Sequence, residues 1–219
     1  MTTRSTPARP ALRITVYDLA PGMQTAASRG CCFVYAPNGG VILSPGGTLG
    51  ADDGGFAEPG SAIRADAAGW IFEVAPAGMP FLQQAEIVRS QVVRPAFGPP
   101  FLVRADRIES PPGAATPRHG HRGPGMRRLV KGRLLAEIGD TIERLESGHA
   151  WFETGLDMVV GTNTGIVNAA FVRVMVLPVE LEGGKSSFMA ANEVEAAKPR
   201  LVMSRLFGET RLDSEESST

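Results

Sequence analysis

Hydrophobic and polar residues alternate along several short segments of the chain, most clearly in two of them. Val103 and Ala105 fall on one side of an extended chain, whereas Arg104 and Asp106 fall on the other. The segment 170–177 repeats the pattern, with a small or branched residue at every second position. A period of two residues is that of a half-buried β-strand. Both segments are therefore predicted to form such strands.

Apolar and β-branched residues predict further strands along most of the chain. Its 26 glycines and 17 prolines exceed ordinary usage, which favours short strands joined by turns over long helices. The one helical candidate, 190–207, is interrupted by Pro199. The predicted fold class is therefore all-β. The predicted strands are 12–19, 31–36, 40–43, 70–75, 86–93, 101–108, 127–138, 149–153, 158–161 and 170–181, with a hairpin turn at 138–141.

Short sequence matches indicate an internal repeat. The pattern Pro-Gly-x-x-Thr at 21–25 recurs at 112–116, and the segment 58–62 is similar to 146–150 at nearly the same offset. Prolines cluster in the segment 91–101 between the two copies. The repeat predicts two copies of one β-unit with a boundary in that segment.

These observations divide the chain into four parts. Residues 1–11 are predicted to form a flexible arm and residues 12–95 an N-terminal barrel. Residues 100–190 are predicted to form a C-terminal barrel. We expect 191–219 to be a partly disordered tail, because 209–219 is acidic and polar with little to bury.

Charge and composition exclude several classes of partner. The chain has 219 residues, with 22 Lys and Arg against 23 Asp and Glu, so no global field attracts nucleic acid or an anionic membrane. No apolar run approaches the roughly 20 residues of a membrane span.

Cys31 and Cys32 are adjacent and would face opposite sides of a strand, which suits two small buried residues rather than a disulfide. We therefore expect a cytoplasmic protein.

A His-x-His pair is the clearest candidate for chemistry. His119 and His121 lie two residues apart, so on a strand both imidazoles leave the same face and can converge on one metal ion or one substrate. The third histidine, His149, follows Gly148 and is predicted to lie in a surface turn.

The sequence around the pair resembles the first motif of the cupin superfamily. That motif runs glycine, five residues, His-x-His, three residues, glutamate, six residues, glycine. Gly113, His119, His121 and Gly132 match it, and Gly125 stands in place of the glutamate.

A weaker match to the second cupin motif follows. Gly148 and Asn163 match its two ends, and Val159 stands in place of its histidine. In the first half of the chain, 28–30 stands where the histidine pair would be. The resemblance implies tandem cupin-like double-stranded β-helix (jelly-roll) barrels, with a degenerate metal motif in the C-terminal barrel and none in the N-terminal one.

The resemblance also implies a metal site. In the family, the two histidines and glutamate of the first motif and the histidine of the second bind one Fe, Mn, Ni or Zn ion. Only His119 and His121 carry over, and two imidazoles are too few for a tight site. Glu153 or Asp157 on a neighbouring strand would have to supply a carboxylate. We therefore expect weak or substoichiometric binding of one divalent transition metal ion.

Arg127 suggests a different site. It lies two residues after Gly125, so on a strand it shares the face of the missing glutamate. A guanidinium can hold a carboxylate bidentately, and a buried one needs a counter-ion from the protein or from a ligand. Arg127, Gly125 and Val159 are thus predicted to line an anion site in which Gly125 leaves room for the ligand. The alternative is that Arg127 or Arg128 points into solvent.

Three functions are compatible with these residues. The first is a metal-dependent cupin enzyme of the dioxygenase, isomerase or decarboxylase type. The second is a metal-free protein that binds a small carboxylate-bearing molecule in the C-terminal barrel. The third is a structural cupin that acts through dimerisation. We expect a small-molecule ligand and a homodimer, with no nucleic acid and no membrane as partners.

Overall fold

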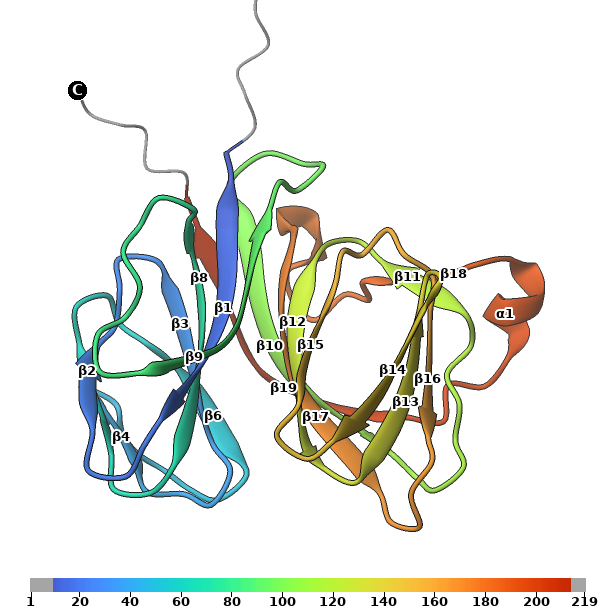
Figure 1. Cartoon of the computed structure of the whole chain (residues 1–219). Coiled ribbons are helices and arrows are strands. Elements are labelled where there is room, and N and C mark those ends of the chain that lie inside the picture. The colour runs from blue at the N-terminus through green and yellow to red at the C-terminus, as the bar shows by residue number, and fades with distance from the viewer. Residues whose placement is uncertain (1–9, 214–219) are drawn as a thin grey trace, which may run out of the picture.

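The structure, a computed structural model, describes residues 10–213. Two β-units follow one another along the chain, and each consists of two antiparallel sheets (Figure 1). The N-terminal unit contains β1 (Leu12–Leu19), β2 (Gln24–Ala26), β3 (Cys31–Ala36), β4 (Val41–Ser44), β5 (Gly47–Leu49), β6 (Asp53–Ala57), β7 (Ala62–Ala65), β8 (Gly69–Pro76) and β9 (Glu86–Val93).

The C-terminal unit has the same elements with additions near its end. Its strands are β10 (Phe101–Ser110), β11 (His119–His121), β12 (Gly125–Lys131), β13 (Arg133–Ile138), β14 (Thr141–Glu146), β15 (Ala150–Glu153), β16 (Val159–Asn163), β17 (Ala169–Pro178), β18 (Phe188–Ala190) and β19 (Met203–Leu212). A 3-10 turn (η1, Val179–Leu181) and a short helix (α1, Glu193–Ala197) lie between β17 and β19.

The two units share one topology. Their inner sheets have the orders β6-β3-β8-β1-β9 and β15-β12-β17-β10-β19. Their outer sheets have the orders β5-β4-β7-β2 and β14-β13-β16-β11-β18, where β18 is an addition. Strands at matching positions in the chain occupy matching positions in the sheets. The predicted all-β fold of tandem jelly-roll barrels is therefore confirmed.

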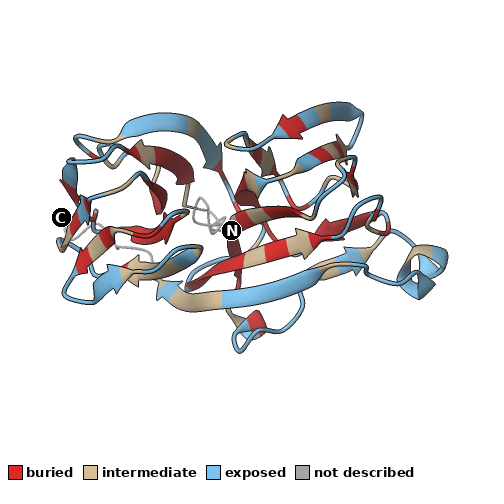
Figure 2. Cartoon of the chain, turned by 90° about the horizontal axis from the view of Figure 1, so that it is seen from below, coloured by how far each residue is buried: buried red, intermediate tan, exposed pale blue. Residues whose placement is uncertain are grey.

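The two inner sheets pack against each other and bury the largest hydrophobic core. This core takes alternate residues from both units, including Phe33 and Phe72 of the first and Val103, Val172 and Val174 of the second. The alternation predicted for β10 and β17 is thus present, with the apolar face of each strand in the shared core. In Figure 2 the buried residues lie mainly on the strands, and α1 is exposed.

The interior of the N-terminal barrel is filled by side chains. A second core, which includes Tyr17, Val34, Ile63 and Ile71, lies between its inner and outer sheets. Cys31 belongs to the shared core and its neighbour Cys32 to this second core. Both cysteines are free and buried, on opposite faces of β3, as predicted.

Three predicted elements need correction. The strand predicted over 170–181 ends at Pro178, and its last three residues form η1. The strand predicted over 127–138 is two strands, because Gly132 between them has a φ of +85° and the chain passes there from the inner sheet to the outer sheet. The stretch 190–207, a helical candidate, forms only the short α1 before Pro199 and then enters β19. The hairpin predicted at 138–141 is present, with Ile138 paired to Thr141.

The end of the C-terminal unit lies beyond the predicted boundary at 190. β19 pairs along its length with β10 and forms the edge of the inner sheet. Glu209 to Leu212, predicted to belong to a disordered tail, are therefore part of the barrel. The reason is that Glu209 pairs with the buried Arg104, a partner that the local sequence does not reveal. Of the predicted arm 1–11, residues 1–9 lie outside the described part of the chain, as do 214–219.

Candidate ligand-binding site

A cavity of about 350 Å³ lies within the C-terminal barrel. Its walls come from the cavity-facing sides of both sheets, and the segments 184–188 and 200–206 complete them. The inner sheet contributes Arg104, Asp106, Arg127, Glu153 and Arg173, and the outer sheet contributes His119, His121, Leu134, Ala136 and Val159.

Strand register places the charged residues in one row across the inner sheet. Arg127 on β12 is paired with Arg173 on β17, and Arg173 is paired with Asp106 on β10. Trp151 on β15 extends the row on the other side of Arg127. Since side chains alternate along a strand, all four project from the same face of the sheet, into the cavity. The neighbouring row brings Glu153 opposite Gly125.

Arg127 is buried and forms an ion pair with Glu153. Nη2 of Arg127 lies 2.6 Å from Oε2 of Glu153, and Nη1 donates a hydrogen bond to the carbonyl oxygen of Gly125 at 2.6 Å. Nε1 of Trp151 donates to Oε1 of Glu153 at 3.0 Å. Burial lowers the pKa of Arg127 to about 10, against the opposing effect of Glu153, so the guanidinium stays charged at neutral pH. The counter-ion that an inward Arg127 requires therefore comes from the protein.

The space beside Gly125 is filled, contrary to the prediction that it holds a ligand. A Cβ atom at this position would lie 2.8 Å from the carbonyl oxygen of Val174 and 2.9 Å from Cγ of Met175. It would also lie 3.1 Å from Nη1 of Arg127. Glycine at 125 is thus what allows the Arg127 side chain to fold back over its own strand.

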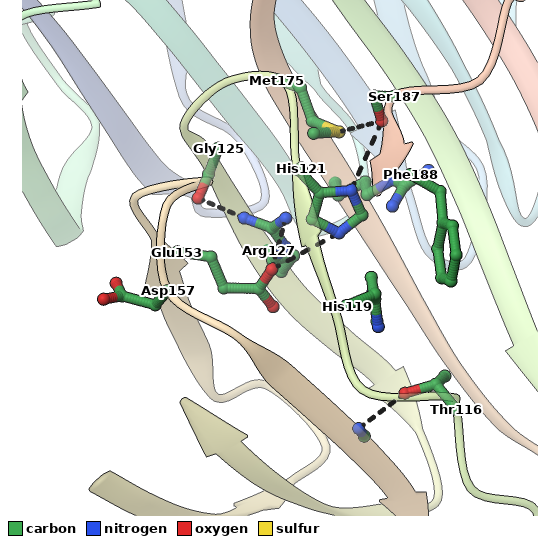
Figure 3. A network of polar contacts seen from close by, with 12 residues as sticks. Thr116, His119, His121, Gly125, Arg127, Glu153, Asp157, Met175, Ser187 and Phe188 are labelled. Carbon is green, nitrogen blue, oxygen red and sulfur yellow. Dashed lines mark hydrogen bonds and ion pairs between the residues drawn. The ribbon is translucent and has the colours of Figure 1, made fainter. Parts of the chain in front are cut away.

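His119 and His121 both project into the cavity from β11 (Figure 3), and their ring centroids are 4.8 Å apart. Nδ1 of His119 lies 2.7 Å from the carbonyl oxygen of Pro117. A carbonyl can only accept, so Nδ1 carries the hydrogen and Nε2 of the neutral ring carries the lone pair. Nδ1 of His121 lies 3.4 Å from Oγ of Ser187, and its Nε2 lies 3.6 Å from Oε2 of Glu153.

Both imidazoles are neutral at pH 7. Burial is the main cause that lowers the pKa of His119, and Arg127 adds to it while Glu153 opposes it. Burial lowers the pKa of His121 well below its usual value, and Arg127, Arg173 and His119 lower it further. Each ring therefore offers the cavity one donor or one acceptor and no charge.

The other predicted site residues lie apart or contribute only surface. The side chain of Asp157 accepts a hydrogen bond from Oγ1 of Thr154 at 2.7 Å, and in Figure 3 its carboxylate points away from the imidazoles. Val159 lines the cavity beside its strand partner His119. His149 lies exposed in a turn and accepts a hydrogen bond from the amide of Glu146, as expected of a surface residue.

The residues present do not fit a bound metal ion in this arrangement. Within residues 10–213 no group of three His, Cys, Asp or Glu side chains is placed to hold one. Glu153 is the only one of the two proposed carboxylates that approaches the imidazoles. The oxygen of Glu153 nearest His121 is also the one that Arg127 contacts. The guanidinium therefore engages the oxygen that a metal ion would need as a ligand.

Sequence reasoning missed the charged wall on β10 and β17. Arg173 donates to both carboxylate oxygens of Asp106, from Nε at 2.6 Å and from Nη2 at 2.9 Å. Arg104 donates to Glu209 at 2.7 Å and to the carbonyl oxygen of Leu181 at 2.6 Å. The alternating pattern of β10 identified the face that carries Arg104 and Asp106. It could not tell a face toward solvent from a face toward a cavity.

A stack of three side chains lies on one side of the cavity. The ring of Phe188 is stacked on His119, with centroids 4.6 Å apart and an interplanar angle of 18°. The guanidinium carbon of Arg200 lies 3.8 Å from the centroid of Phe188. Arg200 is exposed, and no carboxylate within residues 10–213 forms an ion pair with it.

The remaining wall is apolar. Leu134, Ala136 and Trp151 belong to one hydrophobic cluster, against which Phe171 packs, and all four line the cavity. The cavity thus has a charged and polar part on the inner sheet and β11 and an apolar part formed by this cluster. Such a division suits a small ligand with one charged end.

Comparisons with known proteins give similarity of fold alone. No protein-family model and no curated protein sequence matches the chain. A deletion mutant of oxalate decarboxylase from Bacillus subtilis is 12% identical with a TM-score of 0.56, over 87% of this chain and 73% of that one. An IolB-like protein from Salmonella typhimurium is 11% identical with a TM-score of 0.56, over 90% and 97%.

A third similar structure is salicylate 1,2-dioxygenase from Pseudaminobacter salicylatoxidans, 9% identical with a TM-score of 0.52, over 90% of this chain and 76% of that one. No helix in the described residues has the length and apolar character needed to cross a membrane. The shared strand order, the His-x-His strand inside the second barrel and these structural likenesses agree. The chain has the tandem-barrel fold of the cupin superfamily.

Proposed function

We propose that the chain binds a small carboxylate-bearing molecule in the C-terminal cavity, without a metal ion. The observation that carries the proposal is the charge of the lining. Four guanidinium groups face the cavity against two carboxylates, and both histidines are neutral. Glu209, which pairs with Arg104 from outside the lining, still leaves one positive charge uncompensated. That charge is Arg200, which lies exposed at the edge of the cavity and can form a charge-assisted hydrogen bond with an anionic ligand.

Two arginines have N–H groups available to donate hydrogen bonds to such a ligand. Nε and Nη2 of Arg173 are held by Asp106, and no hydrogen bond from Nη1 is present among the described residues. Arg200 forms no ion pair with a carboxylate among the described residues, and its guanidinium lies against the ring of Phe188 at the cavity. We therefore assign the ligand's carboxylate to Arg173 and Arg200, rather than to Arg127, whose charge Glu153 balances.

The apolar wall favours a ligand with a hydrophobic body. About 350 Å³ is at the small end of the range of roughly 300–1,000 Å³ for ligand pockets, which suits a compact ring or a short chain. Trp151 and Phe171 can contact the flat face of a ring. Nε2 of His119 can accept a hydrogen bond from a hydroxyl group on the ligand.

Two of the similar structures suggest small molecules that can be tested as ligands. One acts on oxalate and one on salicylate, and both compounds carry carboxylates. Isothermal titration calorimetry with oxalate, salicylate and the neutral salicyl alcohol would test the proposal. We expect salicylate to bind, and salicyl alcohol to bind at least tenfold more weakly because the charge-assisted hydrogen bonds, worth about 1.5–3 kcal/mol, are lost. Equal binding of the two would overturn the assignment of a carboxylate site.

Two variants locate the site. Arg200→Met, at an exposed position, should weaken salicylate binding severalfold without affecting folding, and Arg173→Met should weaken it more. Arg122→Met is the matched control, because Arg122 pairs with Glu180 on the surface and does not line the cavity. Binding that survives both Arg200→Met and Arg173→Met, in protein that still unfolds cooperatively, would place the ligand elsewhere.

A further inference from the structure

We infer that Ser187, His121 and Glu153 act as nucleophile, general base and positioning carboxylate, so that the C-terminal cavity cleaves a small ester by acyl transfer to serine. The three side chains follow one another in Figure 3, and all three line the cavity. The inference rests on the proposed function in one respect, the carboxylate on the acyl group of the ester. The three residues themselves are independent of it.

The hydrogen-bond directions suit this order of residues. Nδ1 of His121 lies 3.4 Å from Oγ of Ser187, and Nε2 lies 3.6 Å from Oε2 of Glu153. A carboxylate can only accept, so the hydrogen of the neutral ring belongs on Nε2 and the lone pair on Nδ1. Ser187 is then the donor to His121. Both distances are long for hydrogen bonds, and such contacts commonly tighten when substrate binds.

Glu153 is held in place but keeps one oxygen for His121. Its Oε1 accepts a hydrogen bond from Nε1 of Trp151 at 3.0 Å, which fixes the carboxylate. Oε2, the oxygen that faces His121, is buried and accepts no hydrogen bond from the described residues, although Nη2 of Arg127 lies 2.6 Å from it. A carboxylate in this position orients the imidazole and stabilises the imidazolium that forms when the base takes a proton.

Ser187 is fixed beside the base by backbone contacts. Its carbonyl oxygen accepts a hydrogen bond from the amide of Arg122 at 2.9 Å, and its neighbour Phe188 pairs with His121 across β18 and β11. Among the described residues, the other acceptor near Oγ is Sδ of Met175 at 3.8 Å. A thioether is a weak acceptor, so His121 is the stronger partner for the hydroxyl.

The charges around His121 suit this chemistry. Burial, with Arg127 and Arg173, lowers the pKa of His121 well below its usual value, so the ring is neutral and able to accept a proton at pH 7. The same two guanidinium groups favour the negative charge that develops on a carbonyl oxygen under attack. Glu153 offsets them on the side of the imidazole where the positive charge forms.

The reaction balances with water as the only co-reactant. Oγ of Ser187 bonds to the acyl carbon while its proton passes to Nδ1 of His121. The ester's carbon–oxygen bond breaks with its electron pair on the leaving oxygen, which takes that proton. Water then attacks the acyl-serine; its proton passes to Nδ1 and returns to Oγ. One ester and one water thus become one acid and one alcohol.

The position of Arg200 indicates which ester fits. Its guanidinium carbon lies 3.8 Å from the ring centroid of Phe188, and its Nη1 lies 3.5 Å from Oγ of Ser186. Both of these residues are sequence neighbours of Ser187. A carboxylate bound by Arg200 therefore lies close to the nucleophile, which favours an acyl chain that ends in a carboxylate, as in a monoester of a small dicarboxylic acid.

Covalent labelling tests the nucleophile alone. Phenylmethylsulfonyl fluoride is uncharged and sulfonylates activated serines with loss of fluoride. We expect one sulfonyl group per chain, located on Ser187 by peptide mass mapping, and none in folded Ser187→Ala or His121→Gln protein. Ser147→Ala is the control, because Ser147 is an exposed serine that donates to the carbonyl oxygen of Val130 away from the cavity. It should be labelled like the unaltered protein.

Hydrolysis of two p-nitrophenyl esters tests the substrate class. We expect mono-p-nitrophenyl succinate to be cleaved about tenfold faster than p-nitrophenyl acetate, because only the succinate ester has a carboxylate for Arg200. Arg200→Met should remove most of this preference. Ser187→Ala should lose the cleavage of both esters.

The tautomer of His121 tests the role of Glu153. In ¹⁵N NMR spectra of the unaltered protein, His121 should carry its hydrogen on Nε2. That preference should disappear when Glu153→Leu is combined with Arg127→Met, a variant that removes the carboxylate together with its counter-ion. Sulfonylation of Ser187 should also be slower in this variant.

The outcomes separate this inference from the proposed function. Folded protein in which Ser187 is not sulfonylated, equal labelling of Ser187→Ala, or a hydrogen on Nδ1 of His121 would overturn the nucleophile and its base. Labelling of Ser187 without a preference for the succinate ester would support the nucleophile and overturn the carboxylate assignment at Arg200.

Discussion

The two barrels have the same strand order, but one matching row of cross-strand residues differs in character between them, although each barrel buries an ion pair. The matching strands β8 and β17 both end at a proline, Pro76 and Pro178. When the strands are aligned on these prolines, Ile71 of β8 matches Arg173 of β17. Val34 pairs with Ile71 as Arg127 pairs with Arg173. The row that is charged in the C-terminal barrel is thus apolar in the N-terminal barrel.

Tyr17 completes this correspondence, since it pairs with Ile71 as Asp106 pairs with Arg173. In the N-terminal barrel these residues pack into a continuous core, whereas in the C-terminal barrel the equivalent residues surround a cavity. Topology thus sets where the interior lies, and a few cross-strand residues decide whether it is a filled core or a cavity. Fold alone therefore does not assign a function to either barrel.

The largest effect is expected from the core that the barrels share. Phe72→Ala should lower the free energy of unfolding by about 3–5 kcal/mol, because Phe72 is fully buried between the inner sheets. Each unit holds one tryptophan, Trp70 and Trp151, so single-tryptophan variants can follow the units separately in urea. We expect both probes to shift together. Separate transitions, with only the Trp70 signal affected by the substitution, would show that the barrels fold independently.

A smaller loss should follow when the buried pair of the C-terminal barrel is broken. Glu153→Gln should cost about 3 kcal/mol, because it leaves the charge of Arg127 buried without a counter-ion. Adding Arg127→Met to it should recover much of that loss, as an apolar row does in the N-terminal barrel. Urea denaturation of the two variants checks this. A double variant less stable than Glu153→Gln would mean that the pair itself specifies the C-terminal interior.

The pH dependence of stability should also distinguish the barrels, because every histidine of the chain lies in the second one. Folding lowers the pKa of His119 and His121 below 6.5, so below that pH the unfolded chain binds protons that the folded chain does not. The free energy of unfolding should therefore be flat above pH 6.5 and fall as the pH decreases, by at most about 1.4 kcal/mol per pH unit for each histidine.

The control for this effect is a His119→Gln, His121→Gln double variant, in which the fall below pH 6.5 should be smaller. Stability measured by urea denaturation from pH 5 to 8 gives the slope. NMR signals assigned to His119 or His121 that titrate at or above pH 6.5 in the folded protein would contradict the lowered pKa of the two rings.

The smallest effect is expected at the polar contact between the barrels. Arg128 donates to both carboxylate oxygens of Asp18, at 2.7 Å and 3.2 Å, and its guanidinium lies over the ring of Trp70. Asp18→Asn should cost about 1 kcal/mol or less, since the Asp18 side chain is partly exposed. The loss should shrink at high salt. A larger, salt-independent loss would show that this contact, rather than the apolar core, joins the units.

Arg127 and Arg128 show that the strand period does not determine what covers each face of a strand. The alternative that Arg127 or Arg128 points into solvent is wrong, because Arg127 faces the cavity and Arg128 faces the other barrel. The strand period correctly put them on opposite faces. Neither face is in water, because the second barrel covers one and the outer sheet covers the other.

Local pattern determined most of the longer strands, the all-β class and the tandem repeat, because the two-residue period and the turn residues depend only on near neighbours in the chain. It missed short strands such as β2, β5 and β18, and it missed the long edge strand β19. It also placed His119 and His121 on one face of one strand. Gly125, the departure from the cupin motif, was visible in the sequence, although what fills its space was not.

Tertiary structure alone decided which faces are interior and which charges meet. Asp106 and Arg173, Arg127 and Glu153, and Arg104 and Glu209 are far apart in sequence or lie on separate strands, and strand register brings each pair together. A charged side chain on an alternating strand can face water, a cavity or another barrel with the same local pattern. Only the packing of the sheets distinguishes these, because burial and ion pairing depend on residues that are distant along the chain.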